Sequence, residues 1–313
     1  MIFDRPKTWP KVAALVGVAA GLALASTGHA RGGGPRVMAT TTMAADVARS
    51  VVGPDGSVDC LLAPGIDPHS YRPTPRDADR LARADVVVAS GLRLEGKLAD
   101  LLGRLARRVP VVSIGEALPP ERLLEAAAGI PDPHVWFDAG LWSLAPGVVA
   151  ERLAEIEPAA AAGYRQRAGA RAERLRAADD EARRRLEEVP RERRVLVTAH
   201  DAFRYFGRAY DVEVVGVQGT STEAEAGLAD INRLVELLVT KRIPTVFVET
   251  SISDRNVAAL REGARARGHA VALGGRLFSD SLGAPGSGAE TLEEALSANV
   301  AAIVAGLAGG AER

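Results

Sequence analysis

The feature that most constrains the fold of this chain is a regular alternation of short apolar runs with longer amphipathic segments. Runs such as DVVVAS (85–90) and PTVFVET (244–250) have the length and composition of buried strands. Segments such as 94–108 and 253–268 repeat their apolar residues at helical spacing. Repeated strand–helix units predict an α/β fold, with mostly parallel sheets flanked by helices.

Residues 159–190 interrupt this alternation. They are rich in Ala, Arg and Glu and contain no strand pattern. A helix over 161–188 would be about 40 Å long at 1.5 Å per residue, too long for one crossover inside a compact lobe. We therefore predict two similar α/β lobes joined by one long helix, and the alternative is two helices broken near Gly169 or Asp179. The predicted boundaries are an N-terminal lobe over 36–160, a linking helix over 161–189 and a C-terminal lobe over 190–309.

Two further helix predictions depend on single residues. Residues 141–156 are expected to be helical with a kink at Pro146, because proline removes a helical hydrogen bond. Residues 222–242 are expected to form a helix with Thr222 as its N-cap, because a threonine hydroxyl can accept a hydrogen bond from a free amide of the first turn.

The first 30 residues have the layout of a secretory signal peptide. Basic residues precede an apolar run of 15 residues, and small residues follow up to Ala30. We predict cleavage there and a soluble periplasmic protein, with an uncleaved anchor helix as the alternative. The formal charge of −1 gives no basic surface for nucleic acid. Cys60 is the only cysteine, so an internal disulfide and a cysteine metal cluster are excluded.

Three of the five histidines lie in unusual contexts. The pattern Asp-Pro-His-x-aromatic occurs twice, 65 residues apart, at His69 (DPHSY) and His134 (DPHVW). Proline stiffens the backbone before each imidazole. His200 ends the strand pattern VLVTAH, and binding sites in open α/β sheets lie beyond such strand ends. Metal ligands need rigid presentation, so these histidines are candidate ligands, although each taken singly could be a packed or surface residue.

Two carboxylates could complete a metal site. Asp280 lies in the glycine-rich stretch 274–288 after the last predicted strand, where turn capping is the alternative role. Glu249 ends the strand pattern TVFVE. It could orient a histidine ligand from behind, serve as an alternative ligand, or be an ordinary carboxylate at the surface end of a strand.

Five blocks in a fixed order carry a resemblance to a known family. They are GIDPHSYRPTPRDADRLARADVVVASGLRLEGKL, DPHVWFD, VTAHDAFRYF, VFVETSIS and LFSDSLG. Over about 37–308 the chain resembles the metal-binding solute-binding proteins of ABC importers for zinc, manganese and iron. The resemblance implies a metal cleft between the lobes, with two ligands from each. The ligand positions that it implies are His69, His134, His200 and Asp280.

The resemblance also implies partners and a cargo. The cargo is a transition-metal ion and the partner is a membrane ABC permease, while the need for a metallochaperone stays open and a monomer is expected. Trp136 and Phe137, like Tyr205 and Phe206, are expected to pack in the cleft walls rather than contact metal.

Two differences between this chain and members of the family bear on which metal it binds. Zinc members often have a long histidine-rich loop before the second ligand, and the segment before His134 is short and lacks histidine. Manganese and iron members commonly have Glu at the third position, where this chain has His200. Three imidazoles and one carboxylate suit tetrahedral Zn²⁺ better than Mn²⁺. We predict capture and delivery of Zn²⁺, with a manganese or mixed-metal binding protein as the alternative.

Two other classes of function are alternatives to a carrier. A zinc hydrolase needs an open metal position and a base, for which Glu249 is the only candidate, and no His-Glu-x-x-His pattern is present. An interaction or adhesion protein could use the same fold without transport. We therefore predict that the protein is not an enzyme.

Overall fold

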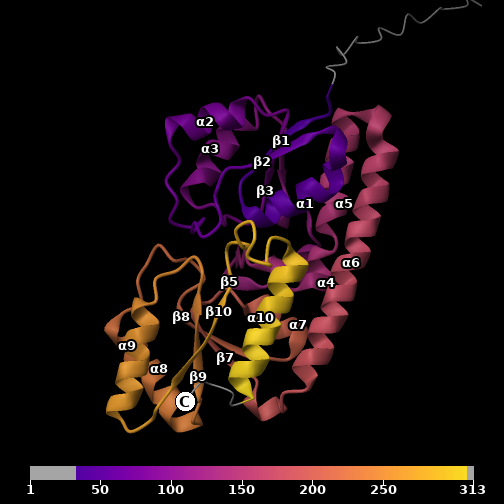
Figure 1. Ribbon diagram of the computed structural model, residues 1–313. Helices are drawn as coiled ribbons and strands as arrows, with labels where there is room; N and C mark the ends of the chain where they lie inside the picture. The colour runs from indigo at the N-terminus through magenta and orange to yellow at the C-terminus, as the bar shows by residue number, and fades with distance from the viewer. Residues whose placement is uncertain (1–32, 309–313) are drawn as a thin grey trace, which may run out of the picture. The chain divides into compact units, whose positions relative to one another are not determined.

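The structure is a computed structural model that describes residues 33–308 (Figure 1). The predicted signal peptide and the last residue of the predicted C-terminal lobe lie outside the described residues. Within 33–308, no helix has both the length and the apolar character that a membrane span requires.

The N-terminal half contains a four-stranded parallel sheet in the order β2-β1-β3-β4. All four residues of β3 are buried, as expected for a strand covered on both faces. Thr41 caps the first helix by accepting a hydrogen bond from the Ala44 amide. The elements are β1 (Arg36–Ala39), α1 (Thr42–Val52), β2 (Ser57–Cys60), α2 (Pro75–Ala82), β3 (Val86–Ala89), α3 (Lys97–Leu105) and β4 (Val111–Ser113).

The segment between this sheet and the long helix differs from the prediction. A short antiparallel hairpin of β5 (Glu125–Ala127) and β6 (Ile130–Pro131) was not anticipated. The prediction of a single kinked helix over 141–156 is wrong, because α4 (Ala139–Trp142) and α5 (Ala145–Ile156) are separate helices. Pro146 lies in the first turn of α5, where its missing N–H leaves no helical hydrogen bond unmade.

The long helix is continuous. α6 spans Ala161–Glu187 without a break at Gly169 or Asp179, which excludes the two-helix alternative. It packs against α1, α4 and α5 of the N-terminal half and against α7 and α10 of the C-terminal half, and Figure 1 shows it running past both. One face of α6 therefore joins the two halves.

The C-terminal half repeats the strand–helix alternation. β7 pairs in parallel with β8, β9 pairs in parallel with β10, and β7 and β9 lie side by side. The elements are β7 (Val195–His200), α7 (Arg204–Tyr210), β8 (Glu213–Gln218), α8 (Leu228–Lys241), β9 (Thr245–Glu249), α9 (Arg255–Ala266), β10 (Ala272–Leu277) and α10 (Leu292–Leu307). The predicted fold class is confirmed, whereas the exact lobe boundaries stay a prediction.

One helix of this half starts later than predicted. α8 begins at Leu228 after Gly227, so Thr222 is not its N-cap. The hydroxyl of Thr222 instead donates a hydrogen bond to Asp67, a residue 155 positions earlier in the chain. A tertiary contact thus replaces the local cap that the sequence suggested.

The largest apolar core crosses from one half to the other. It includes Val47 of α1, Leu175 of α6, Tyr210 of α7 and Ile303 of α10. A smaller core lies between the β7–β9 strands and the helices α8 and α9. Because the halves share a core along α6, the loops at their facing edges are held at a defined separation.

Candidate metal centre

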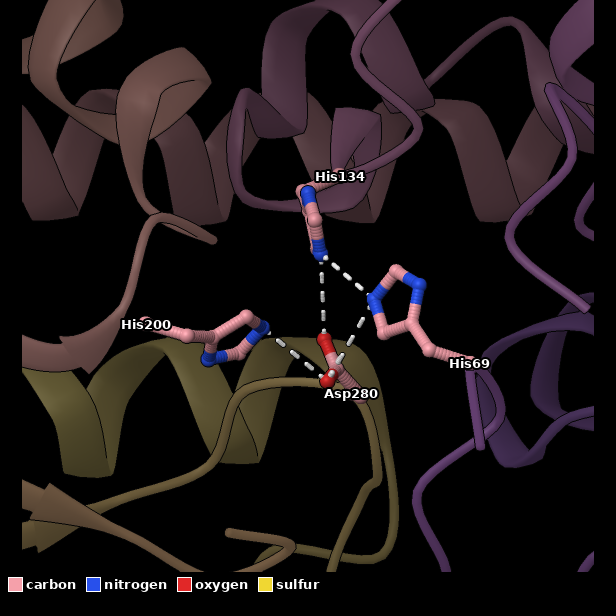
Figure 2. A group of neighbouring side chains, drawn as sticks. All are labelled: His69, His134, His200 and Asp280. Atoms are coloured by element: carbon pink, nitrogen blue, oxygen red, sulfur yellow. Dashed lines mark hydrogen bonds and ion pairs between the residues drawn. The ribbon is translucent and has the colours of Figure 1, made fainter. Parts of the chain in front are cut away.

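Four polar side chains from distant parts of the chain meet between the two halves (Figure 2). They are His69, His134, His200 and Asp280. Each offers one potential ligand atom, these atoms all lie within 4.8 Å of one another, and all four residues are buried. The residues proposed from the sequence are therefore brought together, and their role as metal ligands stays a prediction.

The spacing of the donor atoms suits a small cation. Nε2 of His134 lies 3.2 Å from Nε2 of His69 and 3.4 Å from Oδ1 of Asp280. Oδ2 of Asp280 lies 3.1 Å from Nε2 of His200 and 3.8 Å from Nε2 of His69. Four ligands bound tetrahedrally to Zn²⁺ at 2.0–2.1 Å would be separated by about 3.3 Å. The four side chains thus need little rearrangement to enclose such an ion.

The two Asp-Pro-His motifs build the same local turn. In the first, Oδ1 of Asp67 accepts a hydrogen bond from the His69 amide at 2.9 Å. In the second, Oδ1 of Asp132 accepts one from the His134 amide at 3.0 Å and lies 2.8 Å from Nδ1 of the same ring. The aspartate closes a turn over the proline in both copies, which fixes the backbone that presents each imidazole. Only in the second copy does the aspartate also contact a ring nitrogen, so Asp132 fixes the orientation of the His134 imidazole.

His200 is oriented by a neighbouring strand. It ends β7, and its amide donates to Oε1 of Glu249, the last residue of β9, at 2.9 Å. Nδ1 of His200 lies 2.6 Å from Oε2 of Glu249, while Nε2 faces Asp280. Glu249 therefore stands behind the imidazole and outside the group of four donors. Of the roles considered for it, this geometry favours orienting His200 over direct ligation.

The carboxylate of Asp280 is buried among the imidazoles of the cluster. It is 1% exposed. Among the described residues, its oxygens contact the facing imidazoles and accept no other hydrogen bond. A buried carboxylate whose only partners are imidazoles is costly unless those rings are protonated or a metal cation neutralises it. The donor set therefore fits a bound metal ion.

The surroundings shift the pKa values of all four groups. Burial lowers the pKa of His69 to about 4. Burial also opposes protonation of His134, but Asp132 and Asp280 outweigh it and raise the pKa to about 9. Asp280 and Glu249 likewise raise the pKa of His200 well above its usual range. Burial raises the pKa of Asp280, but His200 and His134 hold it well below its usual range. The carboxylates beside His134 and His200 thus favour a proton on each ring, and a metal ion bound at these nitrogens would have to displace those protons.

Aromatic side chains form the wall behind the cluster, as predicted. The fully buried ring of Trp136 packs edge-on against His134, with centroids 5.4 Å apart. Phe137 stacks on Phe203. The hydroxyl of Tyr205 donates to the carbonyl of Asp132 at 3.0 Å, so it supports the second motif.

A groove leads to His69 from the surface. Residues of both halves line it, among them Arg93, Lys97, Ile130, Thr220 and Glu223. We call it the His69 groove. His69 is 4% exposed, whereas His134 and His200 are fully buried, so His69 is the histidine of the cluster nearest to solvent.

Two supporting residues were missed in the sequence. Thr222 lies between two residues that line the His69 groove, Ser221 and Glu223, and its Oγ1 donates to Oδ2 of Asp67 at 2.6 Å. Gly96 has a φ of +46°, and a Cβ atom there would lie 2.3 Å from the carbonyl oxygen of His69. No local pattern signals the Thr222 contact, because it joins distant segments. The glycine directly before α3 was a usable signal for a close backbone approach.

Comparison with known proteins is consistent with this geometry. Residues 37–306 match the family described as zinc-uptake complex component A, periplasmic (ZnuA). The chain belongs to this family of substrate-binding proteins of ABC importers, as the sequence motifs suggested.

Two relatives and one solved structure illustrate the similarity. The zinc-binding protein TroA of Treponema pallidum (strain Nichols) is 40% identical over 286 residues, which is 91% of this chain and 93% of TroA. The manganese-binding lipoprotein MntA of Bacillus subtilis (strain 168) is 40% identical over 273 residues, 87% of this chain and 89% of MntA. The solved structure of periplasmic zinc-binding TroA from Treponema pallidum superposes with a TM-score of 0.86, covering 88% of this chain and 99% of that one.

Proposed function

We propose that His69, His134, His200 and Asp280 bind one Zn²⁺ ion as cargo. The observation that carries this proposal is the buried carboxylate of Asp280, which faces three imidazoles and has no other donor among the described residues. Three nitrogen donors and one carboxylate oxygen are the ligand types that Zn²⁺ takes in tetrahedral sites.

The protein then acts as a carrier that delivers the ion to a membrane ABC permease. Membership of the zinc-uptake family and the similarity to zinc-binding TroA support this role. The signal-like residues 1–30 support export to the periplasm and cleavage near Ala30. We further propose that the carrier works as a monomer. A metallochaperone that loads it would have to approach through the His69 groove, where His69 is nearest to solvent.

The same ligand set argues for binding without catalysis. Four protein ligands complete a tetrahedron, whereas catalytic zinc keeps one position open for water or substrate. Glu249, the only base considered for a hydrolase, lies against Nδ1 of His200, on the side of the ring away from the other donors. The residues therefore support a carrier whose chemistry is ligand exchange.

Release requires that some of the four ligands separate. We propose that the two lobes follow the predicted boundaries and that α6 acts as a stiff link between them. Because α6 packs along both halves, small relative movements are expected rather than wide closure. Small movements suffice to release the ion, because metal–ligand distances tolerate deviations of only about 0.2 Å.

Manganese is the alternative cargo, and the 40% identity to manganese-binding MntA supports it. Competition between Zn²⁺ and Mn²⁺ for metal-stripped protein lacking residues 1–30 tests the choice. We expect one Zn²⁺ per chain, bound far more tightly than Mn²⁺. Equal or stronger Mn²⁺ binding would keep the carrier role and overturn the zinc assignment.

A second measurement tests the site itself. The His200→Ala variant should bind Zn²⁺ weaker by orders of magnitude, because a tetrahedral ligand is lost. Zinc should also raise the melting temperature of the wild-type protein, since the ion binds the folded state. Wild-type affinity in His200→Ala, or no thermal shift at saturating zinc, would contradict a metal site between the halves.

A further inference from the structure

The position of Asp280 depends on the hydrogen bonds of the loop residues beside it. Both oxygens of the Asp280 side chain face imidazoles and accept no other hydrogen bond among the described residues. Apart from the imidazoles of His134 and His200, no described group therefore donates to the carboxylate before a metal ion arrives. The backbone that presents Asp280 to these imidazoles is placed by the contacts of the neighbouring residues, 278–282.

Asn299 and Ser251 of the same half hold Phe278 and Ser279, and the opposite half of the protein holds three of those neighbours as well. Residues 279, 281 and 282 each form a hydrogen bond with a group from the N-terminal half. Nε1 of Trp136 donates to the carbonyl of Ser279 at 2.9 Å. The amide of Gly65 donates to Oγ of Ser281 at 2.8 Å. The amide of Leu282 donates to Oγ1 of Thr42, also at 2.8 Å. Asp280 is thus bracketed on both sides by bonds that cross between the halves.

Trp136 has a special place among the three groups. It follows His134 by two residues, in the short 3₁₀ helix Val135–Phe137, and its ring packs against the His134 imidazole. The same side chain donates its indole N–H to the residue directly before Asp280. One rigid indole therefore contacts the imidazole of one proposed ligand and the backbone beside another. These two ligands come from opposite halves.

We infer that Trp136 is a positioning residue for metal binding, and that its N–H sets the carboxylate of Asp280 against His134. This inference rests on the proposed function, since it concerns the same four ligands. A tryptophan is suited to the task because its N–H is a donor at the far end of a rigid ring. Without that donor the buried carbonyl of Ser279 loses its partner, and the loop can turn Asp280 away from the imidazoles.

The chain offers a matched control for the test. Trp142 of α4 is also fully buried, but its Nε1 has no hydrogen-bond partner among the described residues. Trp136→Phe and Trp142→Phe delete the same atoms from a buried site, and only the first deletes a hydrogen bond. Zinc affinity, measured by competition with a chelator, should fall about tenfold in Trp136→Phe and stay within about twofold of wild type in Trp142→Phe. Equal affinities in the two variants would overturn the inference.

A double-mutant cycle with Asp280→Ala separates positioning from general support of the fold. If Trp136 acts through Asp280, Trp136→Phe should cause almost no further loss of zinc affinity once the carboxylate is absent. A merely structural tryptophan would weaken binding by the same factor in both backgrounds, and that outcome would contradict the assignment. Failure of the wild-type protein to bind zinc at all would instead count against the proposed function.

If Trp136→Phe does not fold, a milder variant tests the same set of hydrogen bonds between the halves. Ser281→Ala removes the hydroxyl that accepts from Gly65 and donates to the Leu282 carbonyl, and it leaves the aromatic wall intact. It should weaken zinc binding several-fold, again without further effect in the Asp280→Ala background. Ser143→Ala is the control, because within residues 33–308 this buried hydroxyl bonds only the nearby carbonyl of Gly140. Wild-type zinc affinity in Ser281→Ala would overturn the idea that these cross-bonds position Asp280.

Discussion

Nδ1 of His200 lies 2.6 Å from Oε2 of Glu249, and the two residues end the neighbouring strands β7 and β9. The relationship leaves Nε2 as the only ring nitrogen of His200 that can face the other donors. A carboxylate behind a histidine ligand fixes its tautomer and increases its basicity. Glu249 should therefore influence metal binding without touching the metal.

Glu249→Gln tests this influence. We expect zinc affinity to fall by about tenfold, because loss of a partner behind a histidine ligand typically costs 10- to 100-fold. Isothermal titration with a competing chelator measures the change. Glu213→Gln, on the adjacent strand β8, removes a carboxylate that pairs with Lys241 at the surface, and it should bind zinc like wild type. Loss of all binding in Glu249→Gln would indicate a direct ligand instead.

Thr222 is expected to slow the release of metal. Its neighbours Ser221 and Glu223 line the His69 groove. Its hydroxyl donates to Oδ2 of Asp67, and the other oxygen of Asp67 holds the His69 amide. Thr222→Val keeps the side-chain shape and removes this bond, so zinc should leave about fivefold faster in stopped-flow chelation, as expected for one hydrogen bond of about 1 kcal/mol.

Two variants check that the hydroxyl itself is responsible. Thr222→Ser should restore the wild-type release rate. Thr220→Val changes a residue that lines the same groove without reaching Asp67, and it should leave the rate unchanged. An unaltered rate in Thr222→Val would show that the groove does not limit release.

Gly96 should be intolerant of any side chain. Its φ of +46° is rare for other residues, and an added Cβ would lie 2.3 Å from the carbonyl oxygen of His69. Gly96→Ala should lower the free energy of unfolding by on the order of 1–3 kcal/mol, the usual cost of backbone strain, and also weaken zinc binding because His69 is displaced. Chemical denaturation and zinc titration measure the two effects.

Gly129 provides the comparison for that variant. It has a φ of +71° in the hairpin between β5 and β6, and an added Cβ would meet nothing within 4 Å. Gly129→Ala should therefore lose stability through strain while keeping wild-type zinc affinity. Equal zinc affinities in the two alanine variants would argue that the approach of Gly96 does not position His69.

The sequence predicted most elements and all four members of the cluster. The repeated motif at His69 and His134 was informative because the aspartate and proline act on their immediate neighbours, and such effects are visible in sequence. The continuous helix α6 was equally predictable from its composition. These features depend on residues close together in the chain.

The remaining features depend on contacts between distant segments. The hydroxyl of Thr222 bonds Asp67 and does not cap a helix locally. The bond from Trp136 to Ser279 joins residues 143 positions apart. Pro146 was misread for a different reason. A proline inside a helical pattern can mark a kink or a new first turn, and only the packing of α4 and α5 decides which.

The last prediction concerns the stability of the metal-free protein. The folded-state pKa of His134 is raised to about 9, above the ordinary value of 6.5, because Asp132 and Asp280 outweigh the effect of burial. The folded protein therefore binds more protons than the unfolded chain between these pH values. This stabilisation is fully present below about pH 6.5 and is lost as the pH rises through 9.

The free energy of unfolding of metal-stripped protein should accordingly fall between pH 6.5 and 9, by up to about 3 kcal/mol from this group. The raised pKa of His200 acts in the same direction. Urea denaturation in the presence of a chelator measures the slope. His134→Gln should flatten it, whereas His269→Gln, which changes a histidine outside the cluster, should not. Stability that rises over this range would contradict protonation of the metal-free site, because the unfolded chain would then hold the extra protons.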